Sequence, residues 1–99
     1  MILDNLNKQQ IQALKDKDTL RVSVLRFLIS AIKNKEIELR SEHRELTNDD
    51  IAKVIKKQIK QRNYEVDMYT TAGREEQAEK ASSELKILEE LQGLLPENE

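Results

Sequence analysis

Glycine and proline are nearly absent from this chain, and their scarcity limits the folds that the sequence can adopt. The 99 residues include two glycines and one proline, while Leu, Ile, Lys, Glu and Gln dominate. These residue types favour helices, and few residues are present that would interrupt them. The sequence therefore predicts an all-α fold, and its length predicts a single domain.

The spacing of apolar residues, which recur every three or four positions, predicts four helices. They cover residues 4–17, 19–41, 48–72 and 74–95. Asp18 and Thr47 are the predicted N-caps of the second and third helices. Gly73 is predicted to end the third helix in a left-handed conformation, and Pro96 to end the fourth. Short connections favour antiparallel neighbours, so we expect an elongated antiparallel bundle of four helices, with the second and third long.

The second helix has an unusually broad apolar side. One stripe consists of Leu25, Leu28, Ile29, Ile32 and Leu39, and an adjoining stripe of Leu20, Val24, Phe27 and Ala31. A helix that is apolar over half its circumference must contact neighbours on two sides, so the second helix is predicted to be central. The main stripe of the fourth helix consists of Ala78, Ala81, Leu85, Leu88 and Leu95.

The composition argues against several classes of function. No cysteine is present, which rules out disulfides, thiolate metal ligands and a cysteine nucleophile. The net charge of -2 argues against a dedicated nucleic-acid binder, although a local basic patch remains compatible with it. No apolar run reaches the roughly 20 residues of a membrane span, and the first residues lack a secretory signal pattern. We therefore expect a soluble, cytoplasmic protein.

A basic run, KVIKKQIKQR at positions 53–62, raises the question of nucleic-acid binding. At about 100° per residue, its four lysines fall on one side of the third helix, opposite an apolar side. The lysines are Lys53, Lys56, Lys57 and Lys60, and the apolar side consists of Ile51, Ile55, Ile59, Val66 and Tyr69. This lysine face is either a solvated surface or a stripe that contacts phosphates. No aromatic residue is interleaved in the run to stack bases, which argues against recognition of single strands.

Arg62 lies among the apolar residues of the third helix rather than with the lysines. A buried guanidinium needs a compensating charge. Polar residues on or beside the apolar stripes of the other helices are Arg21, Glu36 and Glu84. We therefore predict an inward polar cluster of these four residues, in which Glu36 or Glu84 pairs with Arg62 and fixes the helix register. The alternative is an arginine that binds a ligand or takes part in catalysis.

Catalytic residues are difficult to assemble from this sequence. His43, the only histidine, lies in a polar connection and is expected to be an exposed loop residue rather than a base or a ligand. Ser82 and Ser83 have no histidine to activate them, and no glycine-rich phosphate loop is present. Acidic groups on the helices are expected to be solvated. We predict no catalytic residue, no metal site and no cofactor.

Four stretches that follow one another along nearly the whole chain resemble the YqeY proteins. They are LRVSVLRFLISAIKNKEIEL, IKQR, TAGREEQAEK and ELKILEELQGLLP. The YqeY proteins are relatives of the tail domain of GatB, a subunit of the tRNA-dependent amidotransferase. The resemblance implies a helical N-terminal domain followed by a smaller helical C-terminal domain, and we expect that residues 1–99 contain only the first of these.

The resemblance also implies a function near tRNA. In GatB the tail domain helps to hold the tRNA while other domains do the chemistry, and the family carries the label of a carbon–nitrogen ligase with glutamine as amide donor. We therefore expect a non-catalytic accessory module that contacts tRNA through the lysine face. The alternative is a protein-interaction module without an RNA partner. It would dock through three apolar residues near the end of the last helix, Ile87, Leu91 and Leu94.

Overall fold

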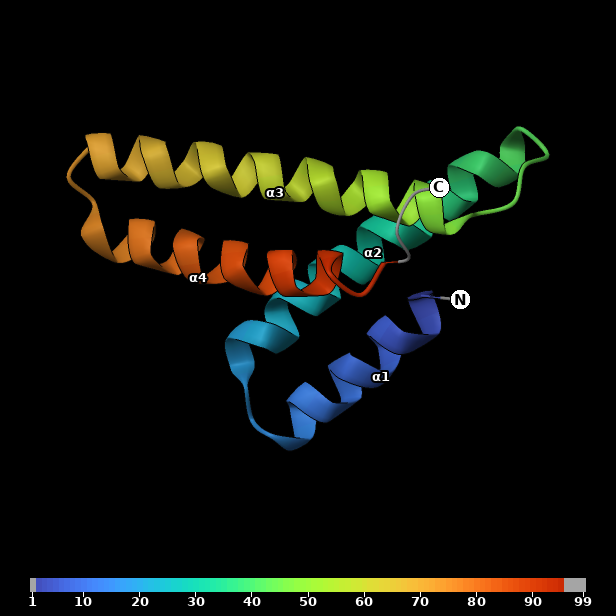
Figure 1. Ribbon diagram of the computed structural model, residues 1–99, viewed down its shortest axis with the longest axis horizontal. Helices are drawn as coiled ribbons and strands as arrows, with labels where there is room; N and C mark the ends of the chain where they lie inside the picture. The colour runs from blue at the N-terminus through green and yellow to red at the C-terminus, as the bar shows by residue number, and fades with distance from the viewer. Residues whose placement is uncertain (1, 96–99) are drawn as a thin grey trace.

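The computed structural model describes residues 2–95, which contain four α-helices and no strand. The helices are α1 (Ile2–Lys15), α2 (Thr19–Ser41), α3 (Asn48–Thr71) and α4 (Glu75–Gln92). In Figure 1, α3 and α4 lie side by side and run in opposite directions, α2 crosses behind them, and α1 lies against α2. The predicted all-α class with four helices is confirmed.

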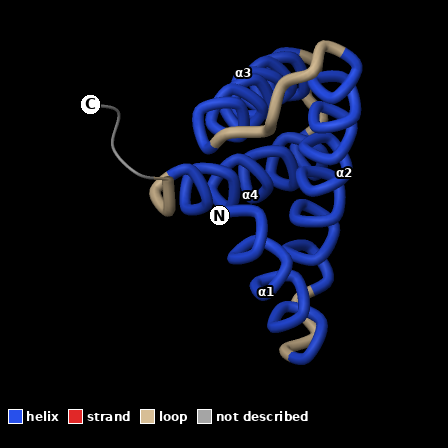
Figure 2. Tube along the Cα trace, turned by 90° about the vertical axis from the view of Figure 1, so that its right-hand side faces the viewer, coloured by secondary structure: helices blue, strands red, loops and turns tan. Residues whose placement is uncertain are grey.

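The molecule is elongated, with principal extents of 46 × 30 × 27 Å. Its Cα radius of gyration is 14.5 Å, compared with about 13 Å for a compact domain of this length. The helix α2 contacts each of the other three helices. Figure 2 shows α3, α4 and α1 arranged along the length of α2. The core therefore follows α2, and the other helices cover its apolar side.

The first apolar stripe of α2 is buried as predicted, whereas the adjoining stripe is only partly so. All five members of the first stripe are at most 5% exposed. In the adjoining stripe Val24 is buried, Leu20 and Ala31 are half-buried, and Phe27 is 55% exposed. The prediction that Phe27 belongs to the core is wrong, because α3 and α4 leave this side of α2 partly uncovered.

Both predicted N-caps are confirmed. The Asp18 carboxylate accepts a hydrogen bond from the backbone N–H of Arg21 at 3.1 Å. The Thr47 hydroxyl accepts the N–H of Asp50 at 3.2 Å, and the Asp50 carboxylate accepts the N–H of Thr47 at 2.9 Å. This reciprocal capping box fixes the start of α3 next to the core. The start of α4, at Arg74, has no side-chain cap.

Three helices end in the same way, with a residue of positive φ. These residues are Lys17 (φ 58°), His43 (φ 58°) and Gly73 (φ 73°). The amide of the following residue donates to a carbonyl five positions earlier, at distances of 3.0, 2.9 and 2.8 Å for Asp18, Arg44 and Arg74. The left-handed Gly73 is thus confirmed, and two non-glycine residues adopt the same conformation at some energetic cost.

The bounds of two helices, α1 and α4, differ from the prediction by two residues or more. The helix α1 begins and ends two residues earlier than expected, since Lys17 takes the left-handed conformation that closes it. The helix α4 ends at Gln92 rather than Leu95. Gly93 is its C-cap, and the Gly93 N–H still donates to the carbonyl of Glu89 at 3.2 Å. Pro96, the predicted end of this helix, lies outside the described residues.

The helix α4 contributes more side chains to the core than predicted. Ile87 and Leu91 are 8% and 1% exposed and belong to the core, whereas Leu94 is 40% exposed. The predicted docking surface is therefore wrong for Ile87 and Leu91. The physical reason is that α4 contacts α2 as well as α3, and so needs apolar residues on two sides.

Candidate functional site

The lysine face points away from the core of the molecule. Lys53, Lys56, Lys57 and Lys60 are all exposed on the unbroken helix α3. On the opposite side, Ile51 and Ile55 are fully buried, and Ile59, Val66 and Tyr69 are half-buried. The orientation predicted for α3 from its periodicity is therefore correct.

Most of the lysine face carries no compensating negative charge. Lys53 forms an ion pair with Asp49, one turn earlier, at 3.4 Å. Within residues 2–95, Lys56, Lys57 and Lys60 form no ion pair with a carboxylate. Their ammonium groups can therefore accept an anionic ligand without first breaking an internal contact.

Two of these lysines also line a groove between α2 and α3, which we call the α2–α3 groove. Its volume is about 520 Å³. Lys53 and Lys57 lie on the α3 side and Lys35 on the α2 side, together with the apolar Phe27, Ala31 and Val54. Asn34 and Gln61 add amide groups to its lining. The groove thus combines positive charge, hydrogen-bonding groups and an aromatic ring.

The two acidic residues of the groove are engaged in local contacts. Glu38 pairs with Lys35 at 3.4 Å. Asp50 is 5% exposed, and its carboxylate accepts hydrogen bonds from the Thr47 N–H at 2.9 Å and the Thr47 hydroxyl at 2.8 Å. These bonds from the Thr47 backbone and side chain lower the pKa of Asp50. Asp50 thus serves the start of α3. Its negative charge still acts on Lys53, but within residues 2–95 it forms no ion pair with Lys53 or Lys57.

Phe27 is the groove residue that sequence reasoning missed. Phe27 is 55% exposed, and the guanidinium carbon of Arg62 lies 5.7 Å from the centroid of its ring. This distance is within the range of a cation–π contact. Spacing within α2 did not decide its exposure, because Phe27 has polar neighbours at Ser23 and Ser30 and apolar neighbours at Val24 and Ala31 three or four positions away.

Arg62 is held by two carboxylates. Its side chain is 12% exposed, its Nη1 lies 2.7 Å from Glu65 Oε2, and its Nε lies 3.6 Å from Glu84 Oε2. Glu84 is one of the two partners predicted for Arg62. The contact with Glu65 was missed, although the i, i+3 spacing on one helix could have suggested it. Together these side chains join α3 to α4.

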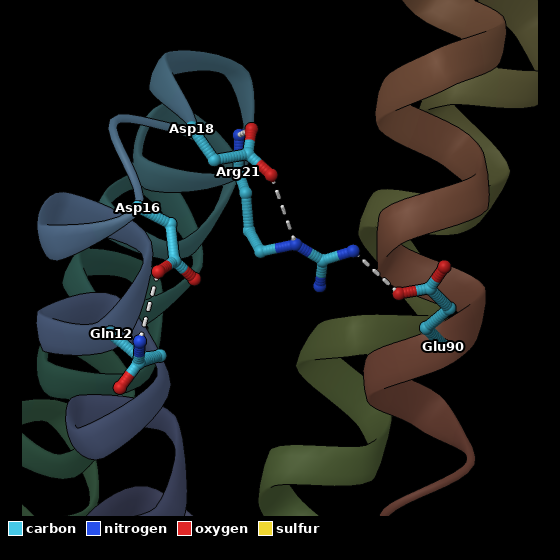
Figure 3. Close-up of polar contacts among 5 residues, drawn as sticks. All are labelled: Gln12, Asp16, Asp18, Arg21 and Glu90. Atoms are coloured by element: carbon cyan, nitrogen blue, oxygen red, sulfur yellow. Dashed lines mark hydrogen bonds and ion pairs between the residues drawn. The ribbon is translucent and has the colours of Figure 1, made fainter.

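The other two members of the predicted cluster lie elsewhere. Figure 3 shows Arg21 between Asp18 and Glu90, with Nη2 2.7 Å from Glu90 Oε2 and Nε 3.5 Å from Asp18 Oδ2. The hydrogen bond to Glu90 raises the pKa of Arg21 further. Glu36 pairs with Arg40 at 3.9 Å on the surface. The single four-residue cluster is therefore wrong, because 15 residues of helix place Arg21 and Glu36 about 22 Å apart.

The remaining sequence candidates are surface features. His43 is exposed, and its backbone closes α2 in the left-handed conformation. Residues 2–95 contain no group of three or more His, Cys, Asp or Glu side chains that could hold a metal ion. In the same range, no helix combines the length and apolarity that crossing a membrane requires.

Comparison with known proteins identifies the family. The family model described as Yqey-like protein matches residues 3–98. The chain belongs to the YqeY-like family. This confirms the resemblance seen in the sequence, and the match extends from α1 to the end of α4 in this YqeY-like chain.

Two relatives carry the name "Altered inheritance of mitochondria protein 41, mitochondrial". The protein of Kluyveromyces lactis is 38% identical over 90 residues, which is 90% of this chain and 48% of the relative. The protein of Lachancea thermotolerans is 33% identical over 92 residues, which is 93% of this chain and 48% of the relative. The YqeY-like chain thus spans about half the length of these relatives. Both names place the relatives in mitochondria, and this finding overturns our prediction of a cytoplasmic protein.

Proposed function

We propose that this YqeY-like chain is a non-catalytic accessory module that contacts tRNA through the lysine face. The proposed setting is amidotransferase chemistry, in which a carbon–nitrogen ligase uses glutamine as amide donor and the module helps to position the tRNA. Membership of the YqeY-like family supports this setting through the kinship with the GatB tail. The names of the two relatives support a mitochondrial location.

One observation carries the proposal: uncompensated positive charge is concentrated on one side of α3. Lys56, Lys57 and Lys60 are exposed within two turns of helix and lack ion pairs among the described residues. Contacts between lysines and phosphates release condensed counterions, so they give binding that is independent of sequence and sensitive to salt. Because the net charge of the chain is -2, attraction to RNA must come from such a local patch.

The test is a titration with bulk tRNA at low and moderate salt. The unmodified protein is expected to bind, with an affinity that falls steeply as salt rises. A variant with Lys53, Lys56, Lys57 and Lys60 replaced by Gln is expected to lose most of this dependence, since each phosphate contact contributes about 0.7–0.9 to the slope of log affinity against log salt.

A matched variant controls for the change in net charge. Lys8, Lys15, Lys80 and Lys86 are exposed and lie on α1 and α4. Their replacement by Gln changes the charge equally and should leave the salt dependence nearly intact. An equal loss of salt dependence in the two variants would show that overall charge, and not the lysine face, governs tRNA binding.

Absence of tRNA binding at low salt would contradict the proposal. The alternative would then be a protein-interaction module without an RNA partner. Of the three residues predicted for that role, Leu94 alone is exposed, so such a module would need another surface.

A further inference from the structure

We infer that the α2–α3 groove receives one unpaired nucleotide of a bound RNA, with its base stacked on Phe27 and its phosphates held by Lys53 and Lys57. This inference rests on the proposed RNA-binding function and adds a recognition element to it. Phosphate contacts alone do not distinguish paired from unpaired RNA, whereas a stacking platform requires a base that is free to leave its own stack.

Phe27 has the features of a stacking platform. It is the only phenylalanine of the chain and is 55% exposed, although Val24 and Leu28 beside it on α2 are buried. It lines the α2–α3 groove and also a small cavity of about 90 Å³ that contains Arg62 and Glu84. Phe27 therefore lies between the groove and the Arg62 cluster and contributes to the lining of both.

Arg62 supports the ring from the side of the cluster. Its guanidinium carbon lies 5.7 Å from the ring centroid, and Glu65 and Glu84 hold the guanidinium in place. A base that stacked on the exposed part of Phe27 would complete a layered arrangement of base, phenyl ring and guanidinium. Because the ring is already positioned, little conformational entropy is lost when a base binds.

The charged and amide side chains of the groove suit the rest of a nucleotide. Lys53 and Lys57 are four positions apart, so their Cβ atoms lie about 5–6 Å apart on one face of α3 and can contact neighbouring phosphates. Asn34 and Gln61 each offer a donor and an acceptor to the edge of a base. The volume of about 520 Å³ is that of a small-ligand site rather than of a duplex-binding channel.

The basic run by itself gave the opposite expectation. It contains no aromatic residue, and recognition of single strands was disfavoured for that reason. The fold supplies the missing ring from α2, where Phe27 lies 26 residues before the first lysine of the face. The structure thus removes the objection to recognition of unpaired bases.

The experiment compares two RNA probes with three protein variants. The probes are a short single-stranded oligoribonucleotide and a blunt-ended RNA duplex. Phe27→Leu should weaken binding of the single strand about tenfold and leave duplex binding unchanged. Phe27→Trp, which keeps an aromatic ring, should bind the single strand as the unmodified protein does. Tyr64→Leu is the control, because Tyr64 is 67% exposed and does not line the groove. The Tyr64→Leu variant should change neither the affinity for the single strand nor that for the duplex.

A second measurement needs no variant. A fluorescent purine analogue in the single strand should be quenched when the unmodified protein binds, because stacking on a ring alters its emission. Unchanged fluorescence on binding, or equal loss of single-strand and duplex affinity in Phe27→Leu, would overturn the stacking inference while leaving RNA binding in place. Failure of the unmodified protein to bind either probe at low salt would instead overturn the proposed function itself.

Discussion

The two ends of the α3–α4 hairpin are held in different ways. Near α2, the hairpin packs into the core through Ile51, Ile55, Leu88 and Leu91, none of which is more than 1% exposed. In the distal half, no residue between positions 59 and 80 is buried. Figure 1 shows this half projecting beyond α2, with only α3 and α4 beside each other. We refer to residues 63–80 as the distal hairpin and to the other described residues as the body.

The comparison shows where the free energy of folding is concentrated. Burial of apolar surface stabilises the body, whereas the distal hairpin relies on half-buried side chains such as Val66 and Tyr69 and on the ion pairs of Arg62. Segments with few buried apolar contacts open locally at low cost. The α2–α3 groove belongs to the body, so the proposed binding site is placed on the more stable part.

The largest expected effect comes from replacing one valine by alanine in each part, which removes two methyl groups in both cases. Val24 is 5% exposed in the body, and Val66 is half-buried in the distal hairpin. We expect Val24→Ala to lower the free energy of unfolding by about 2 kcal/mol and Val66→Ala by about 0.5–1 kcal/mol. Urea denaturation followed by circular dichroism measures both. Equal losses would show that the two parts are stabilised alike.

The next effect concerns the ion pairs at the junction of the two parts. Arg62→Met keeps an unbranched apolar stem but leaves Glu65 and Glu84 without their partner. We expect a loss of about 1–2 kcal/mol, because these carboxylates are only 25% and 21% exposed. Amide hydrogen exchange should accelerate between residues 62 and 84 and remain slow in the body.

Arg40→Met is the matched control for Arg62. Arg40 is 75% exposed and lies 3.9 Å from Glu36, so its loss should change stability by less than about 0.5 kcal/mol. If exchange in the Arg62→Met variant accelerated in the body to the same extent, the distal hairpin would not be a separate unit of unfolding.

Local features were predictable from the sequence because they depend on residues a few positions apart. The burial of Ile51 and Ile55, the caps at Asp18 and Thr47 and the left-handed Gly73 all follow from spacing within one helix and its ends. The same reasoning placed the lysine face on the surface and Arg62 near a carboxylate.

Features that depend on how helices cross were not predictable. Periodicity within α2 could not show that α3 leaves Phe27 open beside Lys53 and Lys57. It also could not show that α4 contacts α2, which buries Ile87 and Leu91. The candidate groove combines side chains from two helices, so sequence reasoning found its lysines but not the groove.

A smaller effect is expected at the capping box, which closes the body end of α3 while α4 begins at the distal end without a side-chain cap. Hydrogen bonds from the Thr47 N–H and hydroxyl lower the pKa of Asp50 in the folded protein. The carboxylate therefore stabilises the fold fully above its unfolded pKa of about 3.9, and this contribution is lost as the pH falls through the lower folded value.

Replacement of Asp50 tests this assignment. Asp50→Asn should lower the free energy of unfolding by about 1 kcal/mol at neutral pH. The difference between the two proteins should shrink as the pH falls below the unfolded value of about 3.9 and through the lower folded pKa of Asp50. Denaturant midpoints of both proteins at several pH values measure this difference in stability. A difference that is independent of pH would show that the charge of Asp50 does not contribute to the cap.

The smallest effect compares the left-handed helix ends in the two parts. The distal hairpin turns at Gly73, where a Cβ would meet no atom within 4 Å. Gly73→Ala should therefore be destabilising through backbone conformation alone, by about 1 kcal/mol.

In the body the same conformation is adopted by Lys17 and His43. Glycine at either position should relieve the backbone strain, which stabilises the fold. It should also raise the entropy of the unfolded chain, which destabilises the fold, so we expect a net stabilisation of only about 0.5 kcal/mol. Glu42→Gly is the control: Glu42 precedes His43 with φ -98°, where glycine brings only the entropic loss. Thermal unfolding should therefore shift upward for His43→Gly and downward for Glu42→Gly, and shifts of the same sign would show that the positive φ of His43 carries no strain.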